Sequence, residues 1–254
     1  MNNVTDHYRT LLAPVYLWMA GGAEAAFARG ESELQAVLPG SWSGLTALDL
    51  GAGFGMHSIP LARRGCKVVA IDSSPLLLEE LRHLSAGLSI TAIEHDLASF
   101  QRYTDHKLDL ILCMGDTLTH LPDRATVDDL LLKVSESLRP GGNFIASFRD
   151  YTAPLVGLQR FIPVRSDTER IMTCFLEYGA EHVEVHDLLH ERHGKDWQFK
   201  ASAYRKLRLD PGRVCAALAS HGLSVRVEPG LSGMIRIVAE EPRFSSSGGP
   251  ARLS

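Results

Sequence analysis

Short apolar runs alternate with segments of helical period through the first 150 residues, and this alternation constrains the fold more than any other feature of the chain. The run Leu108–Met114 is apolar nearly throughout, as parallel strands covered on both faces must be. Strand and helix in alternation predict an α/β fold with a doubly wound, mostly parallel sheet. The expected strands are 45–50, 67–71, 90–93, 108–114 and 143–148.

Helix start signals fall between these runs. Pro75 stands at the first position of one expected helix, after a cap at Ser73 or Ser74. Thr126 is expected to open another, with Asp129 three residues later completing a capping box. A shorter helix is expected over 56–64.

The last third of the chain has a different period. Between Trp197 and Leu209 apolar and polar residues alternate, which predicts a half-exposed strand, with 170–178 and 182–189 as antiparallel neighbours in an inserted meander. Lys200, Lys206 and Arg208 share one face of that strand, and we expect this face to be solvated rather than to bind nucleic acid. A helix over 211–222, capped by Asp210, and a hairpin of 223–227 with 234–239 follow.

Composition excludes several classes of protein. The 254 residues carry a formal net charge of −4, which argues against a protein held mainly by nucleic acid or anionic lipid. The longest apolar run, 11–20, is too short to span a membrane and contains Pro14. The segment before this run lacks the basic start of a signal peptide. The four cysteines form no CxxC pair, so we expect a reduced protein of the cytoplasm, without a zinc ribbon or disulfide framework.

A glycine-rich turn, Gly51-Ala52-Gly53-Phe54-Gly55, follows the first strand and opens a helix. Glycines there allow a sharp bend and let a ligand approach bare backbone amides. The dinucleotide fingerprint needs a third glycine where this chain has Met56, so a nicotinamide-dependent dehydrogenase is disfavoured. Asp72, 21 residues after Gly51, ends the second strand, where a carboxylate can bind two ribose hydroxyls. A turn and a helix-capping acid without any ligand remain the alternative.

These motifs make residues 45–150 resemble the core of class I S-adenosylmethionine-dependent methyltransferases, a Rossmann-like fold with a mostly parallel seven-stranded sheet. The resemblance implies that the glycine-rich turn faces the methionine part of S-adenosylmethionine, that Asp72 binds the ribose, and that Asp96-Leu97 contacts the adenine. It also implies that Met114-Gly115-Asp116 lies beside the transferred methyl group. The cofactor-binding residues expected on this basis are Tyr16, Gly51, Ala52, Gly53, Gly55, Asp72, Ser73, Asp96, Leu97, Met114 and Gly115.

Small-molecule enzymes of the glycine and sarcosine N-methyltransferase type look most similar within that family. They share motifs similar to 115–121 and 148–151 and an aromatic N-terminal helix, which here carries Tyr8, Tyr16 and Trp18. In those enzymes this helix covers the cofactor. The chain has Asp150-Tyr151 where they more often have Asn-Tyr-Asp, so their substrate cannot be transferred to it.

Methyl transfer requires the nucleophile to be aligned with the methyl carbon and water to be excluded. A hydroxyl acceptor usually needs a base, and His120 is the expected catalytic candidate; a structural histidine is the alternative. Asp116, Arg149 and Tyr151 are the expected substrate-binding residues. Asp116 could orient His120 or bind a cationic substrate, or it could instead cap the segment after it. Arg149, whose planar guanidinium suits a carboxylate, could instead pair with Asp150 or another acid.

His186, His190 and His193 have a spacing that would align metal ligands on a helix. The surrounding alternation favours a strand, which puts His193 on the opposite face, so no metal is expected.

Five regions are expected: an N-terminal helical cap (1–44), a cofactor-binding core (45–150), a β-meander substrate lid (151–209), a helix and hairpin that complete the sheet (210–243) and a flexible tail (244–254). The resemblance implies an enzyme that methylates a nitrogen or oxygen of a small molecule, without nucleic acid or membrane partners. A macromolecule methyltransferase, a non-catalytic S-adenosylmethionine sensor and an intramolecular reaction of the cofactor stay open, as does the oligomeric state.

Overall fold

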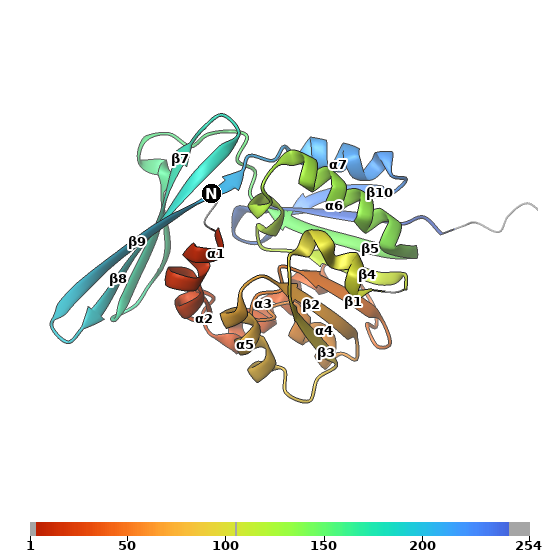
Figure 1. Ribbon diagram of the computed structural model, residues 1–254, viewed down its shortest axis with the longest axis horizontal. Coiled ribbons are helices and arrows are strands. Elements are labelled where there is room, and N and C mark those ends of the chain that lie inside the picture. The colour runs from red at the N-terminus through yellow and green to blue at the C-terminus, as the bar shows by residue number, and fades with distance from the viewer. Residues whose placement is uncertain (1–3, 105, 244–254) are drawn as a thin grey trace, which may run out of the picture.

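A computed structural model describes residues 4–104 and 106–243, and its core is a seven-stranded sheet (Figure 1). The strand order is β10-β11-β5-β4-β1-β2-β3, in which β11 runs antiparallel to both neighbours and the other pairings are parallel. The predicted doubly wound sheet is therefore confirmed. Its strands are Thr46–Leu50 (β1), Lys67–Asp72 (β2), Ile90–Glu94 (β3), Leu108–Cys113 (β4), Leu138–Phe148 (β5), Ser224–Pro229 (β10) and Ile235–Glu240 (β11).

Helices cover both faces of this sheet. Arg124–Ser137 (α6), Pro211–Ser220 (α7) and the 3-10 segment Leu97–Tyr103 (η3) pack on one face. Ala23–Gln35 (α3), Ser58–Arg63 (α4) and Pro75–Leu84 (α5) pack on the other. The apolar side chains between these layers are almost fully buried, and each Leu, Ile or Phe removed from water stabilises the fold by about 1.5–3 kcal/mol.

Side-chain caps set where two helices begin. Ser74 accepts a hydrogen bond from the backbone N–H of Leu77, so the predicted cap of α5 is Ser74 rather than Ser73. The predicted capping box at Thr126 is wrong: α6 begins two residues earlier, because Oδ1 of Asp123 accepts a hydrogen bond from the Thr126 N–H at 2.8 Å. Asp129 instead forms an ion pair with Lys133 on the next turn.

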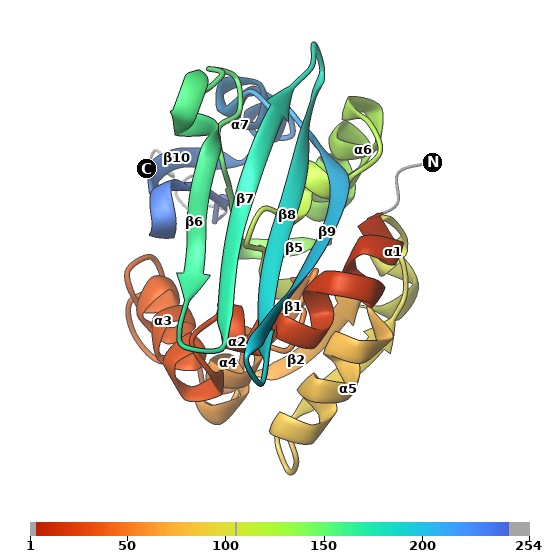
Figure 2. The ribbon, with the colours of Figure 1, turned by 90° about the vertical axis from the view of Figure 1, so that its left-hand side faces the viewer.

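A second, antiparallel sheet is inserted between β5 and α7 and has the order β6-β7-β8-β9. Its strands are Phe161–Ser166 (β6), Arg170–Tyr178 (β7), His182–His193 (β8) and Asp196–Leu207 (β9), preceded by the short turn Gly157–Arg160 (η5). The sequence predicted three of these strands. It did not indicate β6, whose Pro163 is tolerated because the strand lies at the sheet edge. Figure 2 shows this sheet standing in front of the core.

The N-terminal segment lies between the two sheets (Figures 1 and 2). It consists of Val4–His7 (α1), a π-helical turn Tyr8–Leu12 (η1), Ala13–Val15 (η2) and Tyr16–Met19 (α2), and packs on Met172 and Leu189 of the second sheet. In the described part of the chain no single helix is long and apolar enough to cross a membrane. The bent pair Val4–Met19 and Ala23–Gln35, at 78°, meets that standard of length and composition when the two are taken together. The predicted tail, 244–254, lies outside the described residues.

Candidate cofactor and substrate site

The turn after β1 is shaped by three glycines with left-handed backbone. Gly51, Gly53 and Gly55 have φ of +74°, +54° and +92°. A Cβ at Gly51 would lie 2.5 Å from the Thr117 side chain, and one at Gly55 would lie 2.4 Å from Cδ1 of Leu81. The backbone conformation thus favours glycine at these two positions, and a Cβ there would force the neighbouring side chain to shift. The turn presents bare backbone at the carboxyl end of β1, which is what a ligand bound against the amides needs.

Asp72 at the end of β2 is tied directly to this turn. Its Oδ2 accepts a hydrogen bond from the Gly53 N–H at 2.8 Å, and its Oδ1 accepts one from the Ser74 N–H at 2.8 Å. Burial raises the pKa of the carboxyl, and the hydrogen bonds from the backbone oppose this rise. A carboxylate oxygen has more than one lone pair, so both oxygens can still accept hydroxyl groups. Asp72 and the glycine-rich turn therefore form one preorganised unit that fits a nucleoside with a ribose.

Asp96 follows β3 at the same edge of the sheet and begins η3. Its side chain is exposed, and its Oδ1 accepts a hydrogen bond from the Ala98 N–H at 2.9 Å. Leu97 is half-buried and Ser73 is exposed. The predicted contacts of these three residues with the cofactor stay predictions.

The backbone after β4 is fixed by β5. Gly115 donates its N–H to Oγ of Ser147 at 3.0 Å, and Asp116 donates its N–H to the Ser147 carbonyl at 2.9 Å. Met114 is buried, whereas Asp116 has left-handed backbone with a φ of +75°. This conformation is uncommon for a residue other than glycine and is typical of functional sites.

The Asp116 carboxylate connects three segments that are far apart in the sequence. Its Oδ1 accepts a hydrogen bond from the Arg149 N–H at 2.6 Å, just after β5. Its Oδ2 accepts bonds from Nζ of Lys206 on β9 at 2.7 Å and from the Tyr151 hydroxyl at 3.3 Å. The alternative that Asp116 caps the following turn, Thr117–His120 (η4), is wrong, because its side chain makes no capping hydrogen bond there. The structure thus brings the side chains of Asp116 and Tyr151 together, whereas Arg149 contacts the Asp116 carboxylate through its backbone N–H.

Charge and burial define the chemistry of this cluster. The side chains of Asp116 and Lys206 are 8% and 9% exposed. Burial by itself raises the pKa of the Asp116 carboxyl, but the Lys206 ammonium and the Arg149 N–H outweigh it and lower that pKa overall. Burial raises the pKa of the Tyr151 phenol to about 12. At neutral pH the cluster therefore holds a carboxylate, an ammonium and a neutral phenol.

The prediction that Lys206 lies on a solvated face is wrong. The even-numbered face of β9 is in solvent at Lys200 but is buried against the site at Tyr204 and Lys206. Counted over the whole residue, backbone included, these two are 6% and 7% exposed. The odd-numbered face carries Trp197 and Phe199, which are 46% and 56% exposed. The signal that could have placed Lys206 is the end of the alternation: Tyr204, Leu207 and Leu209 put bulky side chains on both faces, as in a strand entering a core.

His120 ends η4 and lies among aromatic rings. Its ring is parallel to that of Tyr204, with centroids 5.5 Å apart, and edge-on to that of Tyr8 at 5.8 Å. Burial, with a smaller contribution from the Lys206 ammonium, lowers the pKa of its imidazole to about 3. The ring is therefore neutral at pH 7 but binds a proton weakly, which disfavours it as a general base. Its catalytic role stays a prediction.

Arg149 presents a guanidinium without an ion-pair partner among the residues that the structure describes. The alternative that it pairs with Asp150 is wrong, since that carboxylate accepts hydrogen bonds from the backbone and hydroxyl of Thr152 instead. The guanidinium lies near Gly233, in the turn Leu231–Gly233 (η6) that joins β10 and β11. A carboxylate of a ligand would suit this unpaired planar group.

Two tyrosines of the N-terminal segment extend from the glycine-rich turn toward the Asp116 cluster. The Tyr16 ring is edge-on to Phe54 of the turn at 5.8 Å, and it stacks on Tyr8 at 6.1 Å. Tyr16 is thus placed beside the expected cofactor position. Trp18 instead packs on the second sheet, where its Nε1 donates a hydrogen bond to Asp167.

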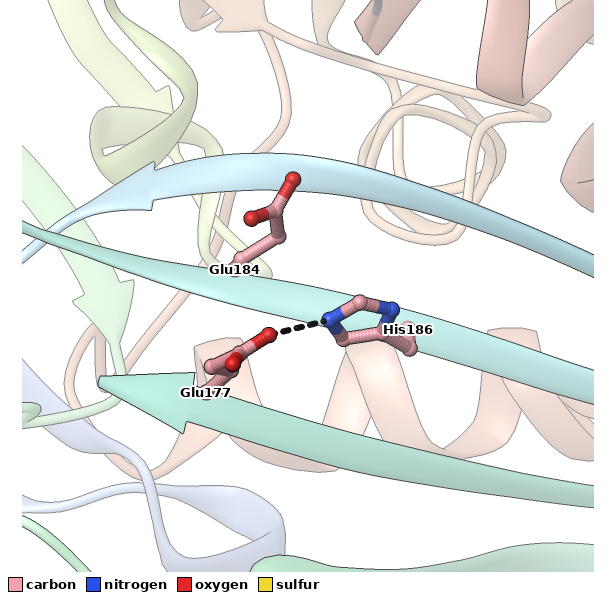
Figure 3. A group of neighbouring side chains, drawn as sticks. All are labelled: Glu177, Glu184 and His186. Carbon is pink, nitrogen blue, oxygen red and sulfur yellow. Dashed lines mark hydrogen bonds and ion pairs between the residues drawn. The ribbon is translucent and has the colours of Figure 1, made fainter. Parts of the chain in front are cut away.

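The three histidines with the spacing of helical metal ligands, His186, His190 and His193, lie on strand β8, as predicted. Figure 3 shows His186 with Glu177 and Glu184, whose potential ligand atoms lie within 4.8 Å of one another. Nε2 of His186 is 3.2 Å from Oε2 of Glu177, so a hydrogen bond accounts for this contact. The ring of His190 packs on Phe199. That no metal binds here stays an expectation.

A surface cavity of about 430 Å³ lies between the N-terminal segment and α5. Leu77, which lines this cavity, also lies near the glycine-rich turn, because its Cδ1 is 3.8 Å from the position of a Cβ on Gly53. Its lining residues are Ala13, Pro14, Leu17, Leu76, Leu77, Glu79, Glu80 and His83.

Comparison with known proteins agrees with this geometry. Residues 47–142 match the family model described as a methyltransferase domain. The chain is 30% identical over 104 residues to a ubiquinone biosynthesis O-methyltransferase from Serratia proteamaculans, covering 40% of this chain and 42% of that protein. It is 30% identical over 157 residues to a cypemycin N-terminal methyltransferase from a Streptomyces species, covering 54% and 62%. The chain thus spans about half the length of these curated relatives.

The fold is similar to that of a solved amino pentose methyltransferase from Micromonospora echinaspora with bound S-adenosylmethionine. The TM-score is 0.72 at 18% identity, covering 90% of this chain and 95% of that one. The finer resemblance to glycine and sarcosine N-methyltransferases stays a prediction. Residues 47–142 are thus similar to a methyltransferase domain, and the sheet topology agrees with the fold of a solved methyltransferase that binds S-adenosylmethionine.

Proposed function

We propose that this protein transfers the methyl group of S-adenosylmethionine to a nitrogen or oxygen atom of a small molecule. The observation that carries the proposal is the shared location of two sites. The glycine-rich turn with Asp72 and the buried Asp116 cluster both lie where core strands end, and open α/β sheets bind ligands at that edge.

The residues of the chain fit S-adenosylmethionine. The turn at Gly51–Gly55 would hold the methionine part and Asp72 the ribose, while Tyr16 would cover the cofactor from the N-terminal segment. Bound there, S-adenosylmethionine supplies an electrophilic methyl group on a sulfonium. The protein has to align the acceptor and exclude water.

A small substrate is supported by the cover over the site. Tyr204 and Lys206 of β9 and Tyr8 of the N-terminal segment contribute side chains to the Asp116 cluster, and these elements surround it. We therefore propose that the second sheet and the N-terminal segment form the substrate lid. A nucleic acid or a folded protein could not reach Asp116 without displacing them.

Calorimetry and product analysis test the proposal. We expect S-adenosylmethionine and S-adenosylhomocysteine to bind, and S-adenosylhomocysteine to form when a library of small hydroxyl, carboxyl and amino compounds is supplied. Absence of binding at millimolar concentrations would contradict the proposal. Binding without product would favour a sensor, product from peptides or RNA alone would favour a macromolecule methyltransferase, and cofactor consumption without acceptor would favour an intramolecular reaction.

We also propose a cytoplasmic location. The support is that Cys66, Cys113, Cys174 and Cys215 are all free thiols, which a reducing compartment preserves. Fractionation of the cells that produce the protein tests this.

A further inference from the structure

The ammonium of Lys206 has unused donors inside the site. Its Nζ donates to Oδ2 of Asp116 at 2.7 Å, and no second acceptor for it lies among residues 4–104 and 106–243. An ammonium carries three N–H donors, so two of them are free to bind a ligand atom. Unpaired N–H donors on a side chain that is only 9% exposed cost free energy, because little water reaches them. The position beside Nζ is therefore suited to an oxygen atom of a ligand.

A second unpaired polar atom lies nearby. Nδ1 of His120 is buried without a hydrogen-bond partner in the described part of the chain. The Tyr204 ring is a common neighbour: the centroid of the His120 ring is 5.5 Å from it, and Nζ of Lys206 is also 5.5 Å from it. The Lys206 ammonium and Nδ1 of His120 thus both lie near the Tyr204 ring with hydrogen-bonding capacity left over. This is expected for a binding site whose ligand has a polar end.

Two carboxylates of this region already accept hydrogen bonds at both oxygens, and the Lys206 ammonium balances the charge of Asp116, so a cationic amine would meet no uncompensated charge there. Both oxygens of Asp116 accept hydrogen bonds. Asp187 on β8 is also occupied, because its Oδ2 lies 2.9 Å from Nε2 of His7 and its Oδ1 accepts a bond from the Cys174 thiol. The two cations, Lys206 and Arg149, by contrast retain free donors.

Among the described side chains of the cluster, His120, Asp116 and Tyr151 are not suited to remove a proton from the acceptor at neutral pH. The pKa of the His120 imidazole is about 3, that of the Asp116 carboxyl is lowered, and that of the Tyr151 phenol is about 12. An acceptor that reaches the site already ionised needs no such base.

We propose that the Lys206 ammonium binds the acceptor atom of the substrate, and that this atom is a hydroxyl or carboxyl oxygen that reacts as an oxyanion. This inference rests on the proposed function and names its substrate class. The acceptor loses its proton to water before it reacts. A lone pair of the oxyanion then forms a bond to the methyl carbon while the carbon–sulfur bond breaks. The electron pair of that bond stays on sulfur and yields neutral S-adenosylhomocysteine.

The first experiment measures binding without turnover. Protein saturated with S-adenosylhomocysteine is titrated in a calorimeter with aromatic compounds that share one ring and carry a hydroxyl, a carboxylate or an amino group, such as phenol, benzoate and benzylamine. We expect the oxygen compounds to bind at least about tenfold more tightly than the amine, and Lys206→Met to abolish this preference. The matched control is Lys200→Met, on the same strand but exposed and paired with Glu191. Tighter binding of the amine, or a preference unchanged in Lys206→Met, would overturn the proposal.

The second experiment uses turnover and distinguishes binding from a structural role. For a phenol that the enzyme methylates, we expect Lys206→Met to lower kcat/KM by about 100-fold, as loss of an oxyanion donor typically does, and Lys206→Arg to restore part of it. Saturation with S-adenosylmethionine is checked first in each variant, so failure of the proposed function is seen separately as failure of cofactor binding. Turnover of amines alone would contradict the inference and leave the proposed function intact.

The pH profile gives a readout that a structural role would not move. We expect kcat of the wild type to rise with pH below the ordinary pKa of a phenol, about 10. The rise should move upward in Lys206→Met, because kcat reports the pKa of the bound acceptor, which the ammonium lowers. The groups facing Lys206 do not ionise in this range, because the pKa values of the tyrosines and the thiol are raised and those of His120 and Asp116 are lowered. They are Asp116, Tyr151, Tyr204, Tyr8, Tyr16, His120 and Cys174. An unchanged profile in Lys206→Met would count against contact between the ammonium and the acceptor.

Discussion

Oδ2 of Asp72 accepts a hydrogen bond from the backbone N–H of Gly53 at 2.8 Å, so the carboxylate at the end of β2 is held against the turn after β1. Two neighbouring strands thereby place a carboxylate and a bare backbone in fixed relation before any ligand binds. Since Oδ1 is held by the Ser74 N–H, neither oxygen is free to rotate away. Preorganisation of this kind lowers the entropy lost when a ligand binds.

Asp72→Ala should therefore weaken S-adenosylmethionine binding by roughly 10- to 100-fold, because hydrogen bonds to a charged group contribute about 1.5–3 kcal/mol. Calorimetry measures the change directly. The control is Glu169→Ala, an exposed carboxylate in the turn between β6 and β7, which should leave the affinity unchanged. An Asp72→Ala protein that is folded and binds the cofactor normally would remove Asp72 from the site.

The buried pair of Asp116 and Lys206 predicts a large effect on stability. Lys206→Met leaves a carboxylate without its cation in a site that is 8% exposed, and breaking such a pair typically costs about 3–5 kcal/mol. The double variant Lys206→Met with Asp116→Asn removes both charges and should recover most of the loss. Urea denaturation of the three proteins measures this. Equal stability of wild type and Lys206→Met would mean that the ion pair contributes nothing to folding.

The lowered pKa of Asp116 also predicts how the free energy of unfolding changes with pH. Its pKa is lower in the folded protein than in the unfolded chain, where it is about 3.9, so the unfolded chain binds the proton more readily. The contribution of the Asp116 carboxylate to the free energy of unfolding is complete above its pKa in the unfolded chain. It is lost as the pH falls through its pKa in the folded protein. Unfolding free energies between pH 6 and pH 3 should thus decline less steeply in the double variant than in the wild type.

The core sheet and the cofactor turn could be predicted because their signals are local. Apolar runs such as Leu108–Met114 identify buried strands, and the spacing from Gly51 to Asp72 follows from the length of one turn, one helix and one strand. Helix α6 shows the limit of such signals, because Asp123 and Thr126 are both good caps and the geometry of the chain selects the first.

The substrate region could not be predicted as well, because it is assembled across sequence separations of up to 180 residues. Nothing local pairs His7 with Asp187, or Asp116 with Lys206. The period-two pattern of β9 predicts which residues share a face, but which face meets the site depends on how the second sheet stands on the core. The pattern is therefore the same for the exposed Lys200 and the buried Lys206.

The His120 imidazole is expected not to titrate in the physiological range. Burial lowers its pKa to about 3 from the ordinary value near 6.5, so the folded protein should keep this ring neutral throughout pH 5–8. The unfolded chain binds the proton between these two values, so stability should fall as the pH decreases from about 6.5 toward 3. NMR titration of the histidine signals tests this, and His120→Gln should make the pH dependence of unfolding less steep. The exposed His193 is the control, and titration of His120 near pH 6.5 would show that the ring is solvated.

A glycine substitution separates the steric demand of the cofactor turn from the cost of its backbone conformation. Gly55 and Gly87 both have left-handed backbone, with φ of +92° and +82°, but a Cβ at Gly55 would lie 2.4 Å from Cδ1 of Leu81, whereas Gly87 has open space around it. Gly87→Ala should cost about 1–2 kcal/mol through the backbone alone. Gly55→Ala should cost about 1–3 kcal/mol more, because Leu81 is fully buried and must move. Thermal or urea unfolding gives both values. Similar losses in the two variants would mean that the core around Leu81 yields easily, and that crowding does not select glycine at position 55.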